Sequence, residues 1–153
     1  LKGDHMVEGE PLCILLVEDN PDHAELALRN LCDAGLANRV FHVEDGEAAL
    51  DYLFNRARYS DQSSYPRPHL VLLDLRLPKV DGIEVLKQVK ASEQLKSIPV
   101  VVLTTSAAER DLAQAYDHYA NSYLTKPVDF DAFSRLLHDL GFYWLAWNKR
   151  PSG

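Results

Sequence analysis

The chain has 153 residues, of which 46% are hydrophobic and 25% are charged, and its formal net charge is −7 at pH 7. This balance is typical of one globular domain with a sizeable core and argues against a disordered chain. An acidic chain lacks the basic face that nucleic-acid binding needs, so we expect no nucleic-acid partner. No apolar run approaches the length of a membrane span, so we expect no membrane partner.

The two cysteines, Cys13 and Cys32, lie in a strand pattern and a helix pattern, without a disulfide framework. This usage predicts a reducing, cytoplasmic location. Residues 1–6 are interpreted as a cloning remnant, because the only methionine is Met6. Residues 10–140 are predicted to form one domain, and residues 141–153 an aromatic C-terminal extension.

The first half of the chain alternates strand and helix patterns. A strand over residues 13–17 precedes a helix that Asn20 caps, that Pro21 begins and that runs to about Ala34, before Gly35. A short strand over 40–43 and a helix over 46–54 follow. The polar stretch 55–68, with two prolines and a Ser-Ser pair, is predicted to be a long surface loop.

The second half repeats the alternation. A third strand ends at Asp74, a loop follows over 77–82, and a helix is expected over 83–91. Pro99 precedes a fourth strand over 100–103, and a helix is predicted over 109–119. A fifth strand over 122–125 leads to Lys126, and the last helix begins at Asp129 or Asp131.

Five strands alternating with five helices predict an α/β fold, a doubly wound five-stranded parallel sheet covered by helices on both faces. The expected strand order is 2-1-3-4-5. Ligands in such sheets bind at the carboxyl ends of the strands where the order reverses, between strands one and three. Asp19 and Asp74 follow those two strands.

Three carboxylates therefore meet at one edge of the predicted sheet, because Glu18 precedes Asp19 at the end of the first strand. Carboxylates at close range repel by roughly 4 kcal/mol per pair near a protein surface, so we expect a cation or a phosphoryl group to use the cluster. Asp19 and Asp74 could bind Mg²⁺ directly and Glu18 through water, while the backbone carbonyl of Arg76 could add a ligand.

A carboxylate such as Asp74 can also act as a nucleophile and accept a phosphoryl group as an acyl phosphate. Phosphoryl transfer needs charge neutralisation, which the metal, the Lys126 ammonium, the Thr104 hydroxyl and the backbone N–H of Thr105 would supply. Taken singly, the strand-end aspartate could be a helix cap, Lys126 a solvated loop lysine and Thr104 an ordinary β-branched strand residue. Their joint placement at the ends of four strands favours a functional site.

Other polar residues are given structural roles. Gly46 and Gly82 are interpreted as turn or helix-start glycines and not as a phosphate loop. Five histidines show no tight metal-ligand spacing and are interpreted as surface or packing residues: His23, His42, His69, His118 and His138.

Four motifs together resemble the response-regulator receiver domains of two-component signalling, over roughly Leu12 to Leu140. They are Ile14 to Asn20, Leu72 to Pro78 with Asp81-Gly82, Pro99 to Ser106, and Lys126-Pro127. The resemblance implies a flavodoxin-like receiver fold whose phosphoacceptor is loaded from the phosphohistidine of a sensor histidine kinase. It also implies that Mg²⁺ or Mn²⁺ is the cofactor.

The same resemblance assigns roles to individual residues. Asp74 corresponds to the phosphoacceptor, and the Lys126-Pro127 bond is expected to be cis. The remaining assignments are the acidic metal pair Glu18 and Asp19, the switch hydroxyl Thr104, the switch aromatic Tyr123 and the phosphate-pairing Lys126. Two positions depart from the common pattern: Arg76 stands where dephosphorylation rate is tuned, and Thr105 is larger than the usual small residue.

The long loop and the aromatic tail are similar to those of stand-alone regulators that partner bacterial phytochrome kinases. No output domain is seen, so a partner protein or self-association is expected to give the output. Alternatives are a phosphate intermediate in a phosphorelay and a scaffold receiver. An aspartate-nucleophile phosphohydrolase would need an acid where Arg76 stands, and a flavin-binding module would need a Ser/Thr/Gly-rich loop after strand one. We therefore expect no enzyme beyond phosphotransfer to, and dephosphorylation of, this chain itself.

The C-terminal segment combines the last predicted helix with an unusual aromatic sequence, residues 142–147. If the last helix is extended through it, large apolar side chains fall on one stripe at spacings of three or four. We expect this stripe to form a homodimer interface. Its members are Phe133, Leu137, Leu140, Trp144 and Trp147.

Overall fold

A computed structural model describes residues 12–33, 37–105, 122–127 and 130–140 of the chain. The described residues form one parallel sheet with the strand order 2-1-3-4-5, which confirms the predicted topology. Its strands are β1 (Leu12–Val17), β2 (Ala37–Val43), β3 (Leu70–Asp74), β4 (Val100–Thr104) and β5 (Ser122–Thr125).

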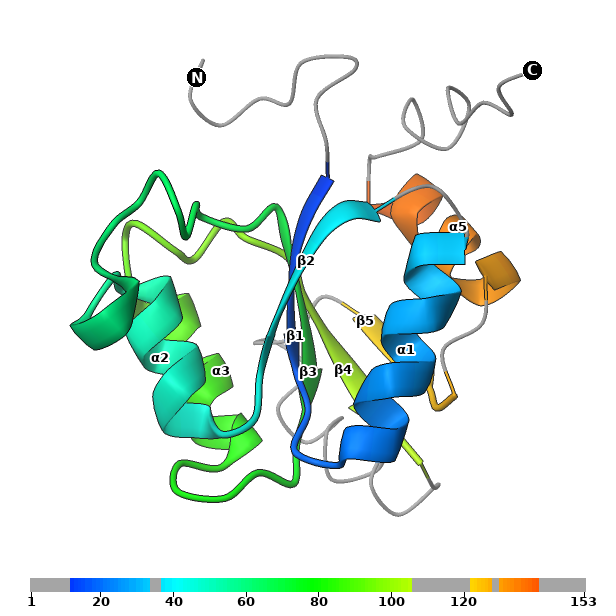
Figure 1. Ribbon diagram of the computed structural model, residues 1–153, viewed down its shortest axis with the longest axis horizontal. Helices are drawn as coiled ribbons and strands as arrows, with labels where there is room; N and C mark the ends of the chain where they lie inside the picture. Colours follow the sequence, from blue (N-terminus) through cyan, green and yellow to red (C-terminus); the bar gives the residue numbers. More distant parts are fainter. Residues whose placement is uncertain (1–11, 34–36, 106–121, 128–129, 141–153) are drawn as a thin grey trace.

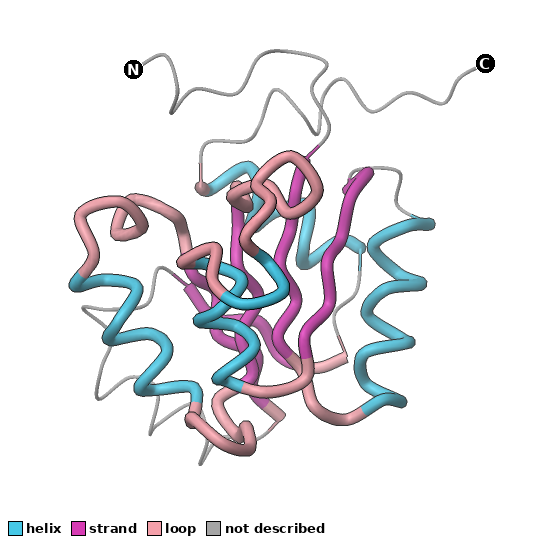
Figure 2. Tube along the Cα trace, turned by 60° about the vertical axis from the view of Figure 1, so that its left-hand side comes forward, coloured by secondary structure: helices cyan, strands magenta, loops and turns pink. Residues whose placement is uncertain are grey.

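Helices cover both faces of the sheet (Figure 1, Figure 2). α1 (Pro21–Asp33) and α5 (Phe130–Asp139) lie on one face, and α2 (Gly46–Leu53) and α3 (Gly82–Ala91) lie on the other. The helix predicted over 109–119 lies outside the described residues. Among the helices that are described, none has the length and apolar character needed to cross a membrane.

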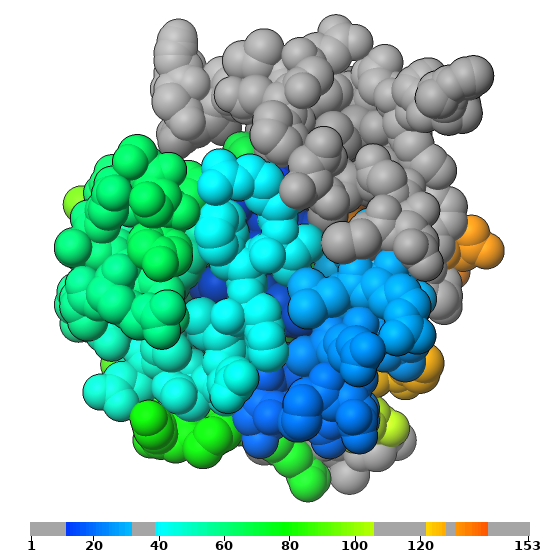
Figure 3. Space-filling view, in the orientation of Figure 1, coloured from blue at the N-terminus to red at the C-terminus, as the bar shows by residue number. Residues whose placement is uncertain are grey.

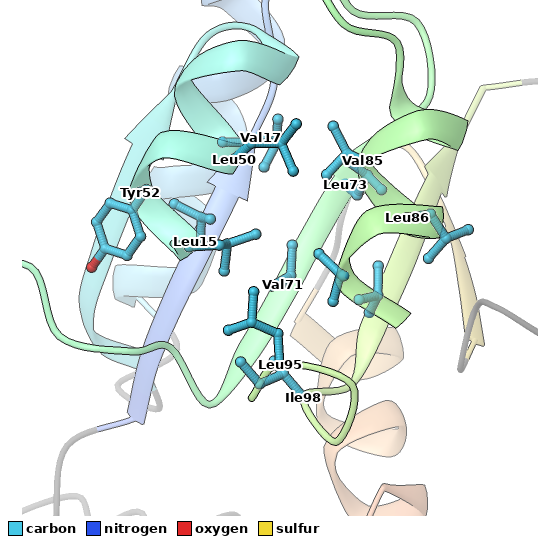
Figure 4. Packing of buried hydrophobic residues seen from close by; sticks show 14 of the residues in the cluster. Leu15, Val17, Leu50, Tyr52, Val71, Leu73, Val85, Leu86, Leu95 and Ile98 are labelled. Atoms are coloured by element: carbon cyan, nitrogen blue, oxygen red, sulfur yellow. The ribbon is translucent and has the colours of Figure 1, made fainter. Parts of the chain in front are cut away.

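β1 is buried along its whole length, as expected for a central strand of a parallel sheet. Its side chains alternate between the two faces. Ile14 and Leu16 join the core under α1 and α5, whereas Leu15 and Val17 join the core under α2 and α3. Figure 4 shows the second of these cores, with Leu15 and Val17 facing the helices.

Three helices begin near the carboxyl edge of the sheet, α1 and α2 directly after β1 and β2 and α3 after a loop, and side-chain caps fix these starts. The Asn20 carboxamide oxygen accepts backbone N–H groups in the first turn of α1, at 2.9 and 3.1 Å. The Asp45 and Asp81 carboxylates do the same for α2 and α3, at 2.7 and 3.1 Å. These caps hold the helix N-termini at the sheet edge where the polar residues gather.

The polar stretch 55–68 is more ordered than its composition suggests. It contains a 3₁₀ turn, η2 (Ala57–Tyr59), and two of its tyrosines, Tyr59 and Tyr65, pack against the core under α2. β2 also begins earlier than predicted, at Ala37, because its backbone pairs with β1 from Leu12 onward. Pairing of backbones across strands is not visible in local apolar patterns, so the predicted strand was too short.

The predicted dimer stripe is corrected by the burial of α5. Phe133 and Leu137 are both 0% exposed and pack with β1, β3 and β4 side chains inside the core of one chain. They are therefore not available to a second copy, and their assignment to a dimer interface is wrong. Leu140 is partly buried against the same core. Trp144 and Trp147 lie outside the described residues, so the homodimer stays a prediction from the sequence.

We expect the variant Phe133→Ala to lose about 3–5 kcal/mol of unfolding free energy, the usual cost of a large cavity in a core. Chemical denaturation monitored by circular dichroism measures the loss. Leu140→Ala is the matched control, because Leu140 is only partly buried and should lose less. Equal, small losses for both variants would show that Phe133 does not belong to the core.

Candidate functional site

The structure brings the predicted polar residues together at the carboxyl edge of the sheet. Glu18 and Asp19 follow β1, Asp74 ends β3, Thr104 ends β4 and Lys126 follows β5. One carboxylate oxygen from each of the three acids lies within 4.8 Å of the others. Asp19 is exposed, whereas Glu18, Asp74 and Thr104 are buried. The predicted cluster of acids is therefore confirmed by the geometry.

The Lys126 ammonium joins two of these acids. Its Nζ lies 2.6 Å from Glu18 Oε1 and 2.7 Å from Asp74 Oδ2. A third partner is His23 Nδ1, at 3.2 Å. An ammonium group has three N–H donors, and the two carboxylates take one each. Because Glu18, Asp74 and the Lys126 side chain are all at least nine-tenths buried, water screens their charges little.

Backbone groups hold the two buried carboxylates in place. The Arg76 N–H donates to Asp74 Oδ1 at 2.9 Å, and the Asn20 N–H donates to Glu18 Oε2 at 3.1 Å. The Lys126 N–H donates to the Thr104 carbonyl at 2.8 Å and so continues the pairing of β4 with β5 past the strand end. Each of the two buried carboxylates thus meets a backbone donor of fixed position, which favours a single arrangement of the site.

The electrostatics of the site follow from burial and pairing. Burial raises the pKa of Glu18, and the nearby Asp74 carboxylate raises it further, while the hydrogen bond from Lys126 opposes both. Burial by itself would lower the pKa of Lys126. The hydrogen bonds and charges of Asp74 and Glu18 outweigh that effect and raise the pKa. Lys126 is thus held in its charged form.

Two glycines let the β3–α3 loop fold back over the end of β3. A Cβ atom at Gly82 would lie 2.6 Å from the carbonyl oxygen of Asp74, and one at Gly46 would lie 1.7 Å from the carbonyl oxygen of Val80. Both glycines begin helices, as predicted. The Lys126-Pro127 bond is cis, as the resemblance implied.

The acids and the lysine line a cavity of about 280 Å³ at this edge of the sheet. Arg76 and Thr105 complete its rim, as expected from their positions after β3 and β4. Tyr123, on β5, lies away from this cavity, half-buried against Leu75 and Val102. The cavity is lined by Glu18, Asp19, Asn20, His23, Asp74, Arg76, Thr105 and Lys126.

Two histidines that were interpreted as surface or packing residues contact residues of the site, and His23 also lines its cavity. His23 contacts Lys126 and lies 3.8 Å from Glu18 Oε2, and His42 Nε2 lies 2.8 Å from the Glu18 carbonyl oxygen. A signal for His23 was present, because it follows Asp19 by four residues, in the first turn of α1. His42 carried no such signal, since its place depends on the pairing of β2 with β1.

The response regulator receiver domain model matches residues 14–138, which include β1 from Ile14 onward and the whole of the other four strands. The chain belongs to this family. Receiver domains of response regulators act in phosphoacceptor signalling, and the acids, the threonine and the lysine assembled here lie at the positions that the family resemblance assigned to that chemistry.

Three relatives match this receiver domain over most of their own length. The probable methanogenesis regulatory protein FilR2 of Methanothrix harundinacea is 49% identical over 97% of this chain and 94% of its own. The structure of the bacteriophytochrome response regulator AtBRR is 48% identical, covers 86% of this chain and 94% of its own, and superposes with a TM-score of 0.78. The Mn²⁺-bound response regulator Rcp1 of Synechocystis is 38% identical, covers 93% and 100%, and has a TM-score of 0.69.

The donor set of the receiver site fits a hard divalent cation. Three carboxylates offer oxygen ligands, the kind that Mg²⁺ and Mn²⁺ prefer. One ammonium opposes them, so two negative charges remain without compensation among these four side chains. A divalent cation would balance the two.

We expect the unfolding free energy to fall as the pH rises above 10.5, partly because of Lys126. Its pKa is raised in the folded chain from an ordinary value of 10.5, so its contribution to stability is complete below that pH. The contribution is lost as the pH passes the folded pKa, where the folded chain must also release the proton. Denaturant unfolding at pH values from neutral to 11 measures this effect. As the pH rises, the unfolding free energy of Lys126→Met should fall less than that of the wild type.

Lys96→Met is the control for this experiment, because Lys96 is half exposed and pairs with the exposed Glu93. Its alkaline loss should match that of the wild type. Parallel curves for wild type and Lys126→Met would contradict the raised pKa.

Proposed function

We propose that Asp74 is the phosphoacceptor of this receiver domain and takes its phosphoryl group from the phosphohistidine of a sensor histidine kinase. The observation that supports this most directly is the contact of 2.7 Å between Asp74 Oδ2 and the Lys126 ammonium, inside a cavity with two further acids. The ammonium already lies where it could pair with phosphoryl oxygens on Asp74. The Arg76 N–H fixes the second carboxylate oxygen.

In the proposed reaction, a carboxylate oxygen of Asp74 attacks the phosphorus of the phosphohistidine. The new O–P bond forms as the N–P bond breaks, and the kinase imidazole leaves with the electron pair of that bond. The product is an acyl phosphate on Asp74, whose added negative charge Lys126 can partly neutralise. Hydrolysis of the acyl phosphate would return the free carboxylate.

Glu18, Asp19 and Asp74 are the residues that would hold Mg²⁺ or Mn²⁺, with the Arg76 carbonyl as a further oxygen. Their oxygens fit such an ion in type and in spacing. When bound, the ion would neutralise charge that develops on the transferred phosphoryl group. The relative Rcp1 supports this assignment, since its structure is described as Mn²⁺-bound.

The signal would leave the site through Thr104 and Tyr123. Thr104 is 2% exposed at the end of β4, and Tyr123 lies on the neighbouring β5, in register with Val102. A phosphoryl group on Asp74 would attract the Thr104 hydroxyl, and Tyr123 would turn inward into the space that this leaves. Such a change would bias the surface around β5 and α5 between two states.

A phytochrome kinase is the proposed donor of the phosphoryl group. The 48% identity with the bacteriophytochrome regulator AtBRR supports it. A second candidate is a kinase that controls methane metabolism, because FilR2 is similar to this chain to the same degree. Rates of phosphotransfer to this chain, measured with purified kinases of the two classes, distinguish the two candidates. The kinase class that transfers its phosphoryl group faster is the supported donor.

We expect the wild-type chain to gain one phosphoryl group when it is incubated with Mg²⁺ and a small phosphodonor such as acetyl phosphate. Asp74→Asn should gain none, because an amide is not a nucleophile of this kind. Asp139→Asn is the matched control, since Asp139 is an exposed carboxylate on α5, and it should be labelled like the wild type. Intact-mass spectrometry measures the label. Equal labelling of Asp74→Asn and wild type would reject the assignment.

We expect millimolar Mg²⁺ to raise the melting temperature of the wild-type chain. An ion present at ten times its dissociation constant stabilises the folded state by about 1.4 kcal/mol. Asp19→Asn should abolish the rise because it removes an exposed carboxylate ligand, whereas Glu25→Gln, exposed on α1 and away from the site, should keep it. Differential scanning calorimetry with and without Mg²⁺ measures the effect. An unchanged melting point in the wild type would count against a metal site.

A further inference from the structure

Four aromatic rings form a cluster at the end of the sheet opposite the acids. Tyr52 of α2 lies at its centre, with ring centroids 5.4 Å from Phe41, 5.3 Å from Tyr59 and 5.9 Å from Tyr65. Tyr59 and Tyr65 are 5.0 Å apart and nearly perpendicular. Tyr52 is fully buried, whereas the other three rings are only partly buried and reach the surface.

Hydrogen bonds fix the loop that supplies two of these rings. The Tyr52 hydroxyl donates to the Pro66 carbonyl at 2.9 Å, and Figure 4 shows this hydroxyl directed away from the labelled aliphatic core. The Asn55 carboxamide donates to the carbonyls of Tyr59 and Tyr65 at 3.1 and 3.3 Å. These hydrogen bonds give the loop a defined conformation and hold the side chains that it presents in defined places.

Two exposed arginines lie on the outer faces of this cluster. The guanidinium carbon of Arg39 is 5.1 Å from the centroid of Phe41, and that of Arg58 is 5.3 Å from the centroid of Tyr59. Both distances are typical of cation–π contacts. Neither arginine forms an ion pair within the described part of the chain. Their planar groups are therefore pre-oriented while their hydrogen-bond donors remain open to a ligand.

The charge balance of this surface contrasts with that of the whole chain. The cluster carries Arg39 and the loop carries Arg56, Arg58 and Arg67, all exposed, although the chain has a net charge of −7. Asp51 pairs with Arg56 at 3.3 Å, and Asp61 lies in the same loop. Two positive charges therefore remain uncompensated beside half-buried aromatic rings. In Figure 1 this loop lies beside α2, toward the amino ends of the strands, and in Figure 3 its green surface adjoins the cyan surface that includes β2.

We propose that this arginine–aromatic surface, formed by Arg39, Phe41, Arg58, Tyr59 and Tyr65, binds an acidic peptide segment of a partner protein. Guanidinium groups match carboxylates in bidentate geometry, and the adjoining rings offer apolar contact between the charges. A nucleic acid fits less well, because binding along its backbone relies on many phosphate contacts and this surface has only two uncompensated positive charges. The surface is separate from the phosphoacceptor site and does not depend on its chemistry.

A fluorescein-labelled peptide of ten glutamates tests the proposal by fluorescence anisotropy with the full chain at low salt. The wild type should bind it, with affinity that falls as salt is added. The double variant Arg39→Gln/Arg58→Gln should bind at least roughly fivefold more weakly, the factor that one good surface ion pair supplies. Circular dichroism and melting curves verify that the variant is folded.

Two matched variants test whether peptide binding depends on this surface or only on the net charge of the chain. Arg29→Gln/Lys96→Gln removes the same number of charges from exposed positions that pair elsewhere, and it should bind like the wild type. Arg39→Lys/Arg58→Lys keeps the charge but loses the planar, stacked groups, and it should bind more weakly.

Four results would overturn the proposal: no binding by the wild type, equal losses in the two glutamine double variants, unchanged binding by the lysine variant, or tighter binding of a single-stranded oligonucleotide of ten nucleotides. Labelling of Asp74 with a small phosphodonor should be the same in all these variants. Failure of the peptide test and failure of the phosphoacceptor assignment are therefore distinguishable.

Discussion

The contacts of the Lys126 ammonium with Glu18 and Asp74 are the interaction on which the functional edge depends. They tie the end of β5 to the ends of β1 and β3, across β4, with donor–acceptor distances of 2.6 and 2.7 Å. A buried ion pair is costly to desolvate and costly to break, so such a group favours one arrangement of the surrounding strands. The backbone N–H groups of Asn20 and Arg76 satisfy the remaining carboxylate oxygens and make that arrangement unique.

The rest of the fold supplies what this interaction requires. Strands buried on both faces form a rigid platform, and side-chain caps place helix N-termini behind β1, β2 and the β3–α3 loop. The N-termini of these helices, which carry the positive end of the helix dipole, lie near the sheet edge that holds the carboxylates. The site still has more carboxylates than ammonium groups, and this excess suits a divalent cation. The structure of the site is thereby linked to the chemistry proposed for it.

The opposite end of the sheet is organised by different forces. There, ring packing around Tyr52 and a few hydrogen bonds from Asn55 order a loop that is polar in sequence. The aromatic cluster and the acids lie at different positions along the strands, and the two surfaces present opposite charge. A receiver domain built in this way could take up a phosphoryl group at one end and contact a second protein at the other without either surface blocking the other.

The sequence by itself determined the fold class, the strand order and the members of the acidic site, because parallel strands leave a polar residue where each buried run ends. Glu18, Asp74, Thr104 and Lys126 could be placed in this way. Only the tertiary structure decided which face of α5 is buried, since Phe133 suits a core and an interface equally well in a helical stripe. It also decided the roles of His23, His42 and the loop tyrosines. The histidine contacts join segments far apart in the chain, and the tyrosines pack within an irregular loop and against α2. Neither kind of contact has a local periodicity from which it could be predicted.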